Sequence, residues 1–309
     1  MRVLITGSSG FLGKHLVHTF QSNGYDVVPL PSVICDLRNL EDARSLFWSV
    51  KPDLLIHAAA ICGGIGFNGP RQAEMFYQNT LLNLQTLEAA RLAKISKIIG
   101  IASSCAYPDK VVPLKEDDLW AGLPHASVTG YGVAKRLQHL QAELYNQQYG
   151  MIIKTVFLTN LYGPGDYFDD RSHVIAALIR RFVHAQENKL PEVTIWGSGR
   201  PIREMLYVQD AAEGILWVAK SDHSPDEKHL NLGTGIGHSI ANIAFIIRDV
   251  VGYKGQIVFD PDKPDGQAFK VLDVTRVHTS LPWTHRTPLE DGIRQTVEWY
   301  RREYNRVPA

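Results

Sequence analysis

The stretch RVLITGSSGFLG, at residues 2–13, decides the fold. Residues 3–6 are apolar or β-branched and predict a short buried strand over 2–6. Glycines follow at positions 7, 10 and 13, and an amphipathic helix is expected from there to about Asn23. Such glycines allow a tight turn, a close approach to a pyrophosphate and close helix packing, and the helix N-terminus favours phosphates. A structural turn is the alternative, but the flanking strand and helix predict dinucleotide contacts at Gly7, Ser9, Gly10, Phe11, Leu12 and Gly13.

Strands and helices are expected to alternate from here to about residue 164. Strand patterns fall at residues 26–30, 53–57, 97–102 and 152–158, and long helical patterns at 72–93 and 127–149. This alternation predicts an α/β fold with a Rossmann-type, doubly wound parallel sheet.

Beyond residue 164 the alternation decays, and shorter pieces follow. We expect helices at 172–188 and 209–220 and short strands near 193–196 and 205–207. Further structured pieces are expected at 230–232, 240–251, 257–259 and 288–304. The sequence therefore predicts a dinucleotide-binding domain over residues 1–164. Residues 165–309 are expected to form mainly a smaller C-terminal α+β substrate lobe, with some segments returning to the first domain.

Bulk composition narrows the possible partners. The 309 residues carry 32 basic and 32 acidic side chains, so no footprint for nucleic acid appears. Three cysteines suit a reducing compartment better than a disulfide framework. No apolar run approaches the roughly 20 residues of a membrane helix, and the N-terminal strand leaves no room for a signal peptide. We expect a cytoplasmic protein with no membrane or nucleic-acid partner and no metal.

The remaining cofactor contacts are expected where the parallel strands end. Ligands of such sheets bind at the carboxyl ends of the strands, which favours Ala58, Ala59, Ala102, Leu158, Asn160 and Leu161. The second strand ends at Pro29–Ser32 without the acid that would bind a ribose 2′-hydroxyl, which favours NADP over NAD. No nearby arginine is identified for the 2′-phosphate. Asp36 and Leu37 open the next predicted helix, and Asp36 is either a cofactor contact or a helix N-cap.

Ser103, Tyr131 and Lys135 are candidates for proton transfer. A lysine four residues after a tyrosine lies on the same helix face, where its ammonium can favour the phenolate. Ser103 follows a predicted strand and could share the hydrogen bond to a substrate carbonyl. The set is suited to moving a proton on oxygen while a cofactor moves a hydride. Alone, the Tyr131/Lys135 pair could equally be a solvated helix face.

Three features together resemble the extended short-chain dehydrogenases/reductases, which act on nucleotide sugars. They are the glycine-rich phosphate loop at residues 7–13, called the cradle below, Ser103 at a strand end, and the helix with Tyr131 and Lys135. Dehydratases of that branch place two acids after the hydroxyl residue, where this chain has Ser104 and Cys105. The segment SSCAYP at 103–108 instead resembles the GDP-L-fucose synthase family. The resemblance covers nearly the whole chain, with further matches at residues 63–65, 164–168, 172–175, 196–199 and 263–266.

The resemblance implies a bifunctional enzyme that uses NADPH to convert GDP-4-keto-6-deoxy-D-mannose to GDP-L-fucose. It implies a reductase triad of Ser103, Tyr131 and Lys135, and an epimerisation acid/base pair of Cys105 and His173. We propose Cys105 as the base and His173 as the acid, and the sequence leaves open which of the two takes the proton. The ordinary pKa values of cysteine and histidine bracket neutrality, which suits an acid/base pair. Tyr131, Lys135 and His173 are also expected to contact the cofactor. The implied substrate contacts are Ser104, Asn160, Arg181, Trp196, Arg203 and Asp265, and a homodimer through the helices at 72–93 and 127–149 is implied as well.

Several alternatives remain open from the sequence. Cys105 could be a small buried apolar residue, and His173 could be a helix-start cap. Arg180 lies closer to the helical face of His173 than Arg181 does, so the choice between these two arginines as the phosphate contact stays open. The same chemistry on another nucleotide-linked 4-keto sugar, of a heptose or colitose pathway, is the nearest rival. A simple 4-reductase or 4-epimerase and a non-catalytic dinucleotide sensor are the others. Departures from the family at residues 8–9, 29–32, 66–69 and 267–269 concern cofactor preference and sugar identity, not the reaction class.

Overall fold

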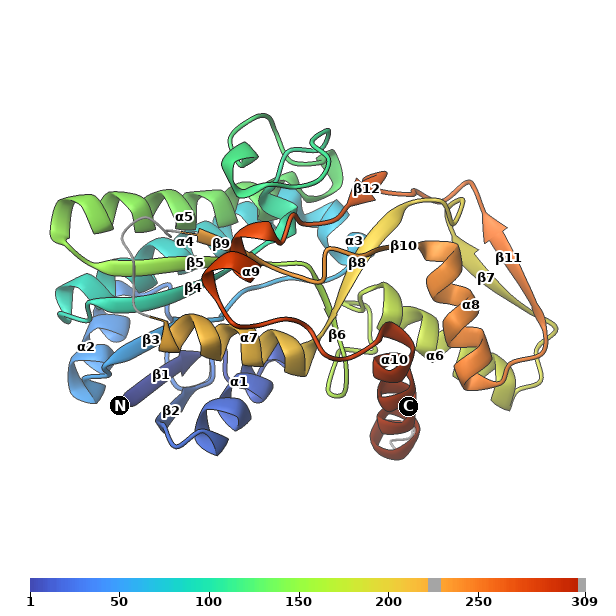
Figure 1. The fold of residues 1–309 in the computed structure, drawn as a ribbon, viewed down its shortest axis with the longest axis horizontal. Coiled ribbons are helices and arrows are strands. Elements are labelled where there is room, and N and C mark those ends of the chain that lie inside the picture. Colours follow the sequence, from blue (N-terminus) through green and yellow to red (C-terminus); the bar gives the residue numbers. More distant parts are fainter. Residues whose placement is uncertain (222–228, 305–309) are drawn as a thin grey trace.

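The computed structural model describes residues 1–221 and 229–304. Its main sheet contains six strands in the order β2-β1-β3-β4-β5-β9, and every pair is parallel. The strands are β1 (Arg2–Thr6), β2 (Asp26–Leu30), β3 (Leu54–His57), β4 (Lys97–Ser103), β5 (Ile152–Leu158) and β9 (His229–Leu232). The α/β, doubly wound fold predicted from the sequence is confirmed (Figure 1).

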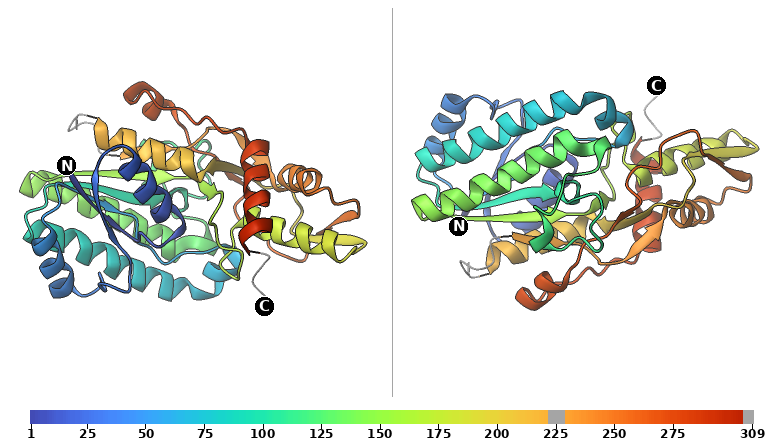
Figure 2. Two further views of the ribbon diagram at one scale, coloured as in Figure 1. Left: turned by 90° about the horizontal axis from the view of Figure 1, so that it is seen from below. Right: turned by 90° about the horizontal axis from the view of Figure 1, so that it is seen from above.

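Helices cover both faces of this sheet (Figures 1 and 2). One face carries α2 (Leu40–Val50), α4 (Gln72–Leu92) and α5 (Thr129–Tyr149), and the other carries α1 (Phe11–Ser22) and α7 (Val208–Lys220). Strand β1 shows why: Val3 and Ile5 pack into the core beneath α1 and α7, whereas Leu4 packs toward α2 and α4. Alternate side chains of a strand point to opposite faces, so a strand buried on both sides is apolar throughout.

The second half of the chain builds a smaller lobe beside the sheet's carboxyl edge (Figure 1). Its strands are β6 (Asn160–Tyr162), β7 (Glu192–Trp196), β8 (Ile202–Tyr207), β10 (Gly237–Ser239), β11 (Gln256–Asp260) and β12 (Phe269–Lys270). Its helices are α6 (Val174–Glu187), α8 (Ile240–Val251) and α10 (Leu289–Trp299), which enclose an apolar core of their own. Two further short helices are α3 (Ile65–Asn68) and α9 (Thr275–Ser280).

Two segments of the second half lie against the main sheet. Strand β9 pairs with β5 from Thr155↔His229 to Leu158↔Leu232, and α7 packs on α1. Glu204, on β8, is fully buried and links these parts. Its carboxylate accepts hydrogen bonds from the backbone N–H groups of Thr234, of Gly235 at 2.9 Å and of Leu272 at 2.8 Å. Hydrogen bonds from several backbone donors stabilise a buried carboxylate. Glu204 therefore holds β8 to the loop after β9 and to the chain just after β12.

Some predicted boundaries are wrong, for identifiable reasons. The helix expected to open at Asp36 begins at Leu40, because the Asn39 side chain caps it by accepting from the N–H groups of Glu41 and Asp42. The reading of Asp36 as the N-cap is therefore wrong. The structured piece expected over residues 288–304 is an α-helix over Leu289–Trp299 that continues as a π-helix over Tyr300–Tyr304. Strands β6, β10 and β12 were not predicted, because two or three residues carry no readable periodicity.

Within residues 1–221 and 229–304, no helix is long and apolar enough to cross a bilayer.

Candidate active site

The loop between β1 and α1 has the geometry of a phosphate cradle. Gly7 adopts a φ of +67°, which favours glycine. A Cβ on Gly13 would lie 2.0 Å from the carbonyl oxygen of Gly7, so only glycine fits where the helix meets the loop. The N-terminal turn of α1 then opens toward the cavity described below, as a dinucleotide pyrophosphate requires. The residues present fit a bound dinucleotide.

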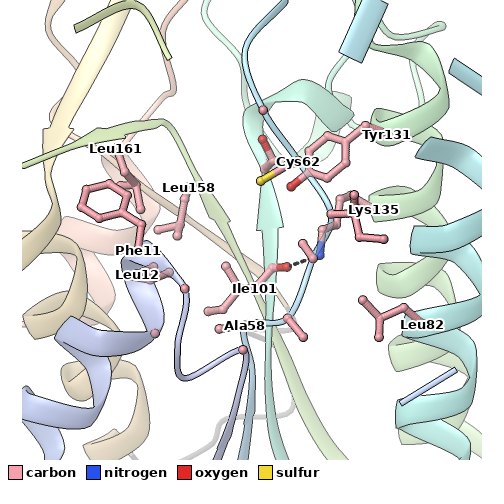
Figure 3. A pocket seen from close by; sticks show the side chains of 18 of the residues that line it. Phe11, Leu12, Ala58, Cys62, Leu82, Ile101, Tyr131, Lys135, Leu158 and Leu161 are labelled. Atoms are coloured by element: carbon pink, nitrogen blue, oxygen red, sulfur yellow. Dashed lines mark hydrogen bonds between the residues drawn. The ribbon is translucent and has the colours of Figure 1, made fainter. Parts of the chain in front are cut away.

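One cavity of about 680 Å³ lies over the carboxyl ends of the central strands. Its volume suits a large organic ligand. In Figure 3, Phe11 and Leu161 lie on one side of it, and Tyr131 and Lys135 on the other. Every residue predicted to contact the cofactor lines it: Gly7, Ser9, Gly10, Phe11, Leu12, Gly13, Asp36, Leu37, Ala58, Ala59, Ala102, Tyr131, Lys135, Leu158, Asn160, Leu161 and His173.

An arginine that the sequence analysis did not identify also lines this cavity. Arg38 forms an ion pair of 2.7 Å with Asp36, and the Arg38 side chain lowers the pKa of that carboxyl. The expectation that no arginine lies near the end of β2 is therefore wrong. Arg38 follows the strand by eight residues, and the loop between them folds back to the cavity wall. A search of the whole segment between β2 and α2, rather than of the strand end alone, would have found it.

Tyr131 and Lys135 project from the first turns of α5 into the cavity, where β4 delivers Ser103. Burial, with smaller contributions from Cys62 and Cys105, raises the pKa of Tyr131 well above its ordinary value. Burial lowers the pKa of Lys135 to about 8. The Lys135 ammonium donates to the Ile101 carbonyl at 2.8 Å (Figure 3) and to the Gln138 side chain at 3.0 Å. Tyr131 is thus a protonated phenol at neutral pH, and not the phenolate that the spacing suggested.

Cys62 is a cavity residue for which the sequence analysis assigned no role. The thiol lies beside the Tyr131 hydroxyl, as Figure 3 shows, and the two side chains are hydrogen-bonded. Cys62 as a whole residue is exposed, but desolvation of the thiol by the surrounding cavity wall raises the pKa of Cys62. The residue sits just after β3, in the loop that leads to Gly63 and Gly64. Only its position at the end of a strand could have signalled it, because a single cysteine has no motif.

Cys105 lies next to a cation from the far end of the chain. The Nζ atom of Lys270, on β12, is 3.2 Å from the Cys105 sulfur. Burial opposes ionisation of the thiol, but Lys270, the Ser103 hydroxyl and Arg203 outweigh it and lower the pKa of Cys105. The backbone N–H of Cys105 also donates to the Ser103 hydroxyl at 3.2 Å. Lys270 was not predicted, since no local pattern marks it.

His173 lines the same cavity as Cys105, at the N-cap position of α6. Its side chain makes no capping hydrogen bond, which leaves the imidazole available to a ligand. Burial, reinforced by Lys270, lowers the pKa of His173 to about 4. The imidazole is therefore neutral at pH 7 in this pocket, and its pKa lies further from neutrality than the ordinary histidine value.

Asp166 adds a buried carboxyl to the cavity wall. One of its oxygens accepts from the Tyr167 N–H at 2.7 Å, and the other is buried with no hydrogen-bond partner among the residues that the structure describes. Burial raises the pKa of Asp166 to about 7. The group therefore changes charge near neutral pH, which makes the protein's stability depend on pH in that range.

Four of the predicted substrate contacts gather on the second lobe, outside the cavity lining. Arg181 lies over the Trp196 ring, 5.4 Å from its centroid, and Arg203 donates to the backbone carbonyl of Asp265 at 3.3 Å. Arg180 instead donates to the Phe168 carbonyl at 2.8 Å, so Arg181 is the one of the pair that reaches this group. Ser104 is only 2% exposed and does not line the cavity, so the structure does not bring it to the site.

Among the described residues, one group has the composition of a metal site. Donor atoms of His139, Glu143 and His229 lie within 4.8 Å of one another, between α5 and β9. None of the three lines the cavity, and His139 also hydrogen-bonds Thr155 at 3.2 Å. The chemistry of the cavity makes no use of this group.

The fold and the cavity together are those of a dinucleotide-dependent enzyme, and comparison with known proteins agrees. Residues 3–233 match the model of the NAD dependent epimerase/dehydratase family. The chain belongs to this family, and is thus an NAD(P)-dependent enzyme.

Curated relatives narrow the placement within the family to GDP-L-fucose synthases and related GDP-sugar enzymes. The chain is 39% identical to GDP-L-fucose synthase of Escherichia coli K12, over 97% of this chain and 96% of that one. It is 32% identical to GDP-L-colitose synthase of Yersinia pseudotuberculosis, over 99% of both chains. Among solved structures, a GDP-L-fucose synthetase from Naegleria fowleri bound to NADP superimposes with a TM-score of 0.89 at 30% identity, covering 99% of this chain and 95% of that one. A GDP-6-OMe-4-keto-L-xylo-heptose reductase from C. jejuni superimposes with a TM-score of 0.91 at 28% identity, covering 97% of both.

Proposed function

We propose that this protein is a bifunctional 3,5-epimerase/4-reductase that uses NADPH to convert GDP-4-keto-6-deoxy-D-mannose to GDP-L-fucose. The observation that carries the proposal is the joint placement of two proton-transfer sets around one cavity. Ser103, Tyr131 and Lys135 make up one set, and Cys105 and His173 the other. A simple 4-reductase needs only the first set.

Epimerisation is assigned to Cys105 and His173. A 4-keto group acidifies the hydrogens on C3 and C5, because the carbanion delocalises into an enolate. Cys105 is the base, since neighbouring positive charge favours its thiolate. The C–H bond breaks, the proton goes to sulfur, and hydrogen bonds from Tyr131 and Ser103 to O4 stabilise the enolate. His173 starts neutral, so it takes one proton from solvent and delivers it to the opposite face of the carbon, while Cys105 releases its proton to solvent.

Reduction is assigned to Tyr131, Lys135 and Ser103. The bound NADPH supplies the hydride that reduces C4. Tyr131 is protonated at neutral pH, so it begins in the form needed to donate a proton to O4. The cationic Lys135 lies one helical turn away and disperses the negative charge that the phenol acquires. Ser103 holds O4 in line by donating a hydrogen bond.

The substrate's GDP end is assigned to the second lobe. Arginines recognise diphosphates through paired hydrogen bonds, and Trp196 presents an exposed ring beside Arg181. We propose that residues 1–164 hold mainly the dinucleotide and residues 165–309 mainly the sugar nucleotide. The heptose and colitose relatives make those 4-keto sugars the alternative substrates, and turnover of a panel of nucleotide-linked 4-keto sugars with NADPH and NADH would rank them.

The assembly is assigned as a homodimer through α4 and α5, which lie side by side on one surface (Figure 2). Large apolar side chains are exposed there: Phe76, Tyr77, Leu84, Leu140, Leu144 and Tyr149. Exposed apolar side chains gathered on adjoining helices are typical of an interface between copies. A cytoplasmic location is also proposed, because Cys35, Cys62 and Cys105 are free thiols.

Incubation with the GDP-linked 4-keto sugar in D2O tests the reaction. We expect deuterium at both C3 and C5 of the recovered sugar, and exchange into the ketone should continue when NADPH is left out. Enolisation needs only the protein's acid and base, whereas net conversion needs the cofactor. If the sugar turns over with NADPH but carries no deuterium at C3 or C5, epimerisation is refuted and the protein is a ketone reductase only.

A further inference from the structure

A two-residue strand positions one buried lysine against Cys105. Strand β12 (Phe269–Lys270) pairs in parallel with β8, where Lys270 lies opposite Arg203. The fully buried Glu204 accepts from the N–H of Leu272 at 2.8 Å and so anchors the chain just beyond the strand. These contacts bring the Lys270 ammonium to 3.2 Å from a sulfur that lies 165 residues earlier in the chain.

The environment of the Lys270 ammonium calls for a negative partner. The residue is 7% exposed, and a buried charge is costly unless it is paired. Within the part of the chain that the structure describes, its one side-chain hydrogen bond is to Cys105, and no carboxylate forms an ion pair with it. A neutral thiol would leave this charge uncompensated, whereas a thiolate pairs with it.

The other ionisable groups around Cys105 act in the same direction or weakly against it. Arg203 on β8 favours the thiolate, as does the Ser103 hydroxyl at the end of β4. Cys62 and Tyr131 also face this part of the cavity, and burial keeps both protonated at neutral pH. His173 is neutral there. Lys270 is the only group among them that contacts the sulfur as a cation.

We propose that Lys270 is a positioning residue that holds Cys105, the base proposed above, as the thiolate before substrate binds. This inference rests on the function proposed above and names the residue that prepares its base. The protons balance as follows. Cys105 loses its proton to solvent in the free enzyme and takes one up when the C–H bond of the keto sugar breaks, while His173 returns one proton to the opposite face of the carbon. Cys105 then releases its proton to solvent and His173 takes one from solvent, which restores both groups before the second carbon is inverted. Lys270 keeps its charge throughout and transfers no proton.

Alkylation of Cys105 by iodoacetamide in the ligand-free enzyme measures the thiolate directly, because only the thiolate reacts. The rate is followed from pH 5 to pH 10 by mass spectrometry of the peptide that contains Cys105, since Cys62 lies in the same cavity. In Lys270→Met the rate at pH 7 should fall by about tenfold or more, the effect of a pKa raised by about one unit. Lys270→Arg, which keeps the positive charge, should stay near the wild-type profile. Lys254→Met removes an exposed lysine of the second lobe and serves as the matched control.

An unchanged alkylation profile in Lys270→Met would overturn the proposal. A rise in KM for the sugar nucleotide with no change in alkylation would assign Lys270 to substrate binding alone. If Lys270→Met does not fold, a wild-type enzyme whose Cys105 shows an ordinary thiol pKa would overturn it equally. The alkylation measurements need no substrate, so they remain valid if deuterium exchange fails and the proposed reaction is wrong.

Discussion

Arg38 and Asp36 form an ion pair of 2.7 Å in the wall of the dinucleotide cavity. The end of β2 has no acidic residue that could bind a ribose 2′-hydroxyl. Arg38 instead places a guanidinium in the same cavity wall, paired with the carboxylate of Asp36. A guanidinium can exchange one oxygen partner for a phosphate without losing hydrogen bonds. Arg38 is therefore the described residue best placed to select the 2′-phosphate of NADPH.

Replacing Arg38 tests this selection. In Arg38→Ala we expect the KM for NADPH to rise about tenfold, the usual loss for one partly exposed charge-assisted hydrogen bond, while the KM for NADH changes little. Arg44→Ala, which removes another exposed arginine that is paired within α2, is the control. Equal increases for both cofactors would show that Arg38 acts on the fold of the loop and not on the phosphate.

Replacing Tyr131 separates reduction from cofactor binding. In Tyr131→Phe the rate of ketone reduction should fall by about 10² to 10⁴, the range for loss of a general acid, because Tyr131 is the protonated group proposed to face O4. NADPH binding, followed by quenching of protein fluorescence, should remain within about threefold of wild type. Near-normal turnover would remove Tyr131 from the mechanism, and would favour a proton donor such as Cys62.

Replacing Cys105 separates epimerisation from reduction. In Cys105→Ser, solvent deuterium incorporation at C3 and C5 should fall by about 10² or more, since a serine hydroxyl has no accessible anion at neutral pH. Reduction of a ketone that already has the product configuration should fall by less than about tenfold. Losses of the same size in both assays would indicate that Cys105 only packs the site.

The buried carboxyl of Asp166 should make the free energy of unfolding fall as pH rises. Its pKa is about 7 in the folded protein and about 4 when unfolded, so between these values the unfolded chain releases a proton that the folded chain keeps. The stabilising contribution is complete below pH 4 and is lost as pH approaches 7, by at most about 1.4 kcal/mol per pH unit. In Asp166→Asn this slope should disappear, which thermal melts from pH 4 to pH 8 would reveal. The exposed Asp170→Asn is the control, and a slope shared by both variants would contradict the assignment.

The exposed face of α4 and α5 should carry the dimer contact. In Leu144→Glu, which places a charge at a half-exposed apolar position of α5, the sedimentation coefficient should shift from that of a dimer to that of a monomer. Desolvating an unpaired carboxylate in an interface is unfavourable. Val258→Glu, at an exposed apolar position on β11, should leave the assembly unchanged. A wild-type protein that sediments as a monomer would refute the dimer outright.

The sequence alone determined the parts of this protein that depend on neighbouring residues. The glycines at 7, 10 and 13 specify the cradle, because the backbone conformation at Gly7 and the lack of space for a Cβ at Gly13 favour glycine there. The spacing of Tyr131 and Lys135 places both on one helix face, and strand-end positions put Ser103 and Ala102 at the cavity. Each of these features depends on local geometry, so the short stretch of sequence that contains it is enough to predict it.

Only the tertiary structure decided which charges meet at the reactive groups. Lys270 reaches Cys105 across 165 residues through a two-residue strand, Arg38 reaches the cavity through a loop, and Cys62 meets Tyr131 through another. Burial then moved the pKa of His173 to about 4 and that of Asp166 to about 7. Protonation depends on desolvation and on charges a few ångströms away, and neither can be read from the order of residues along the chain.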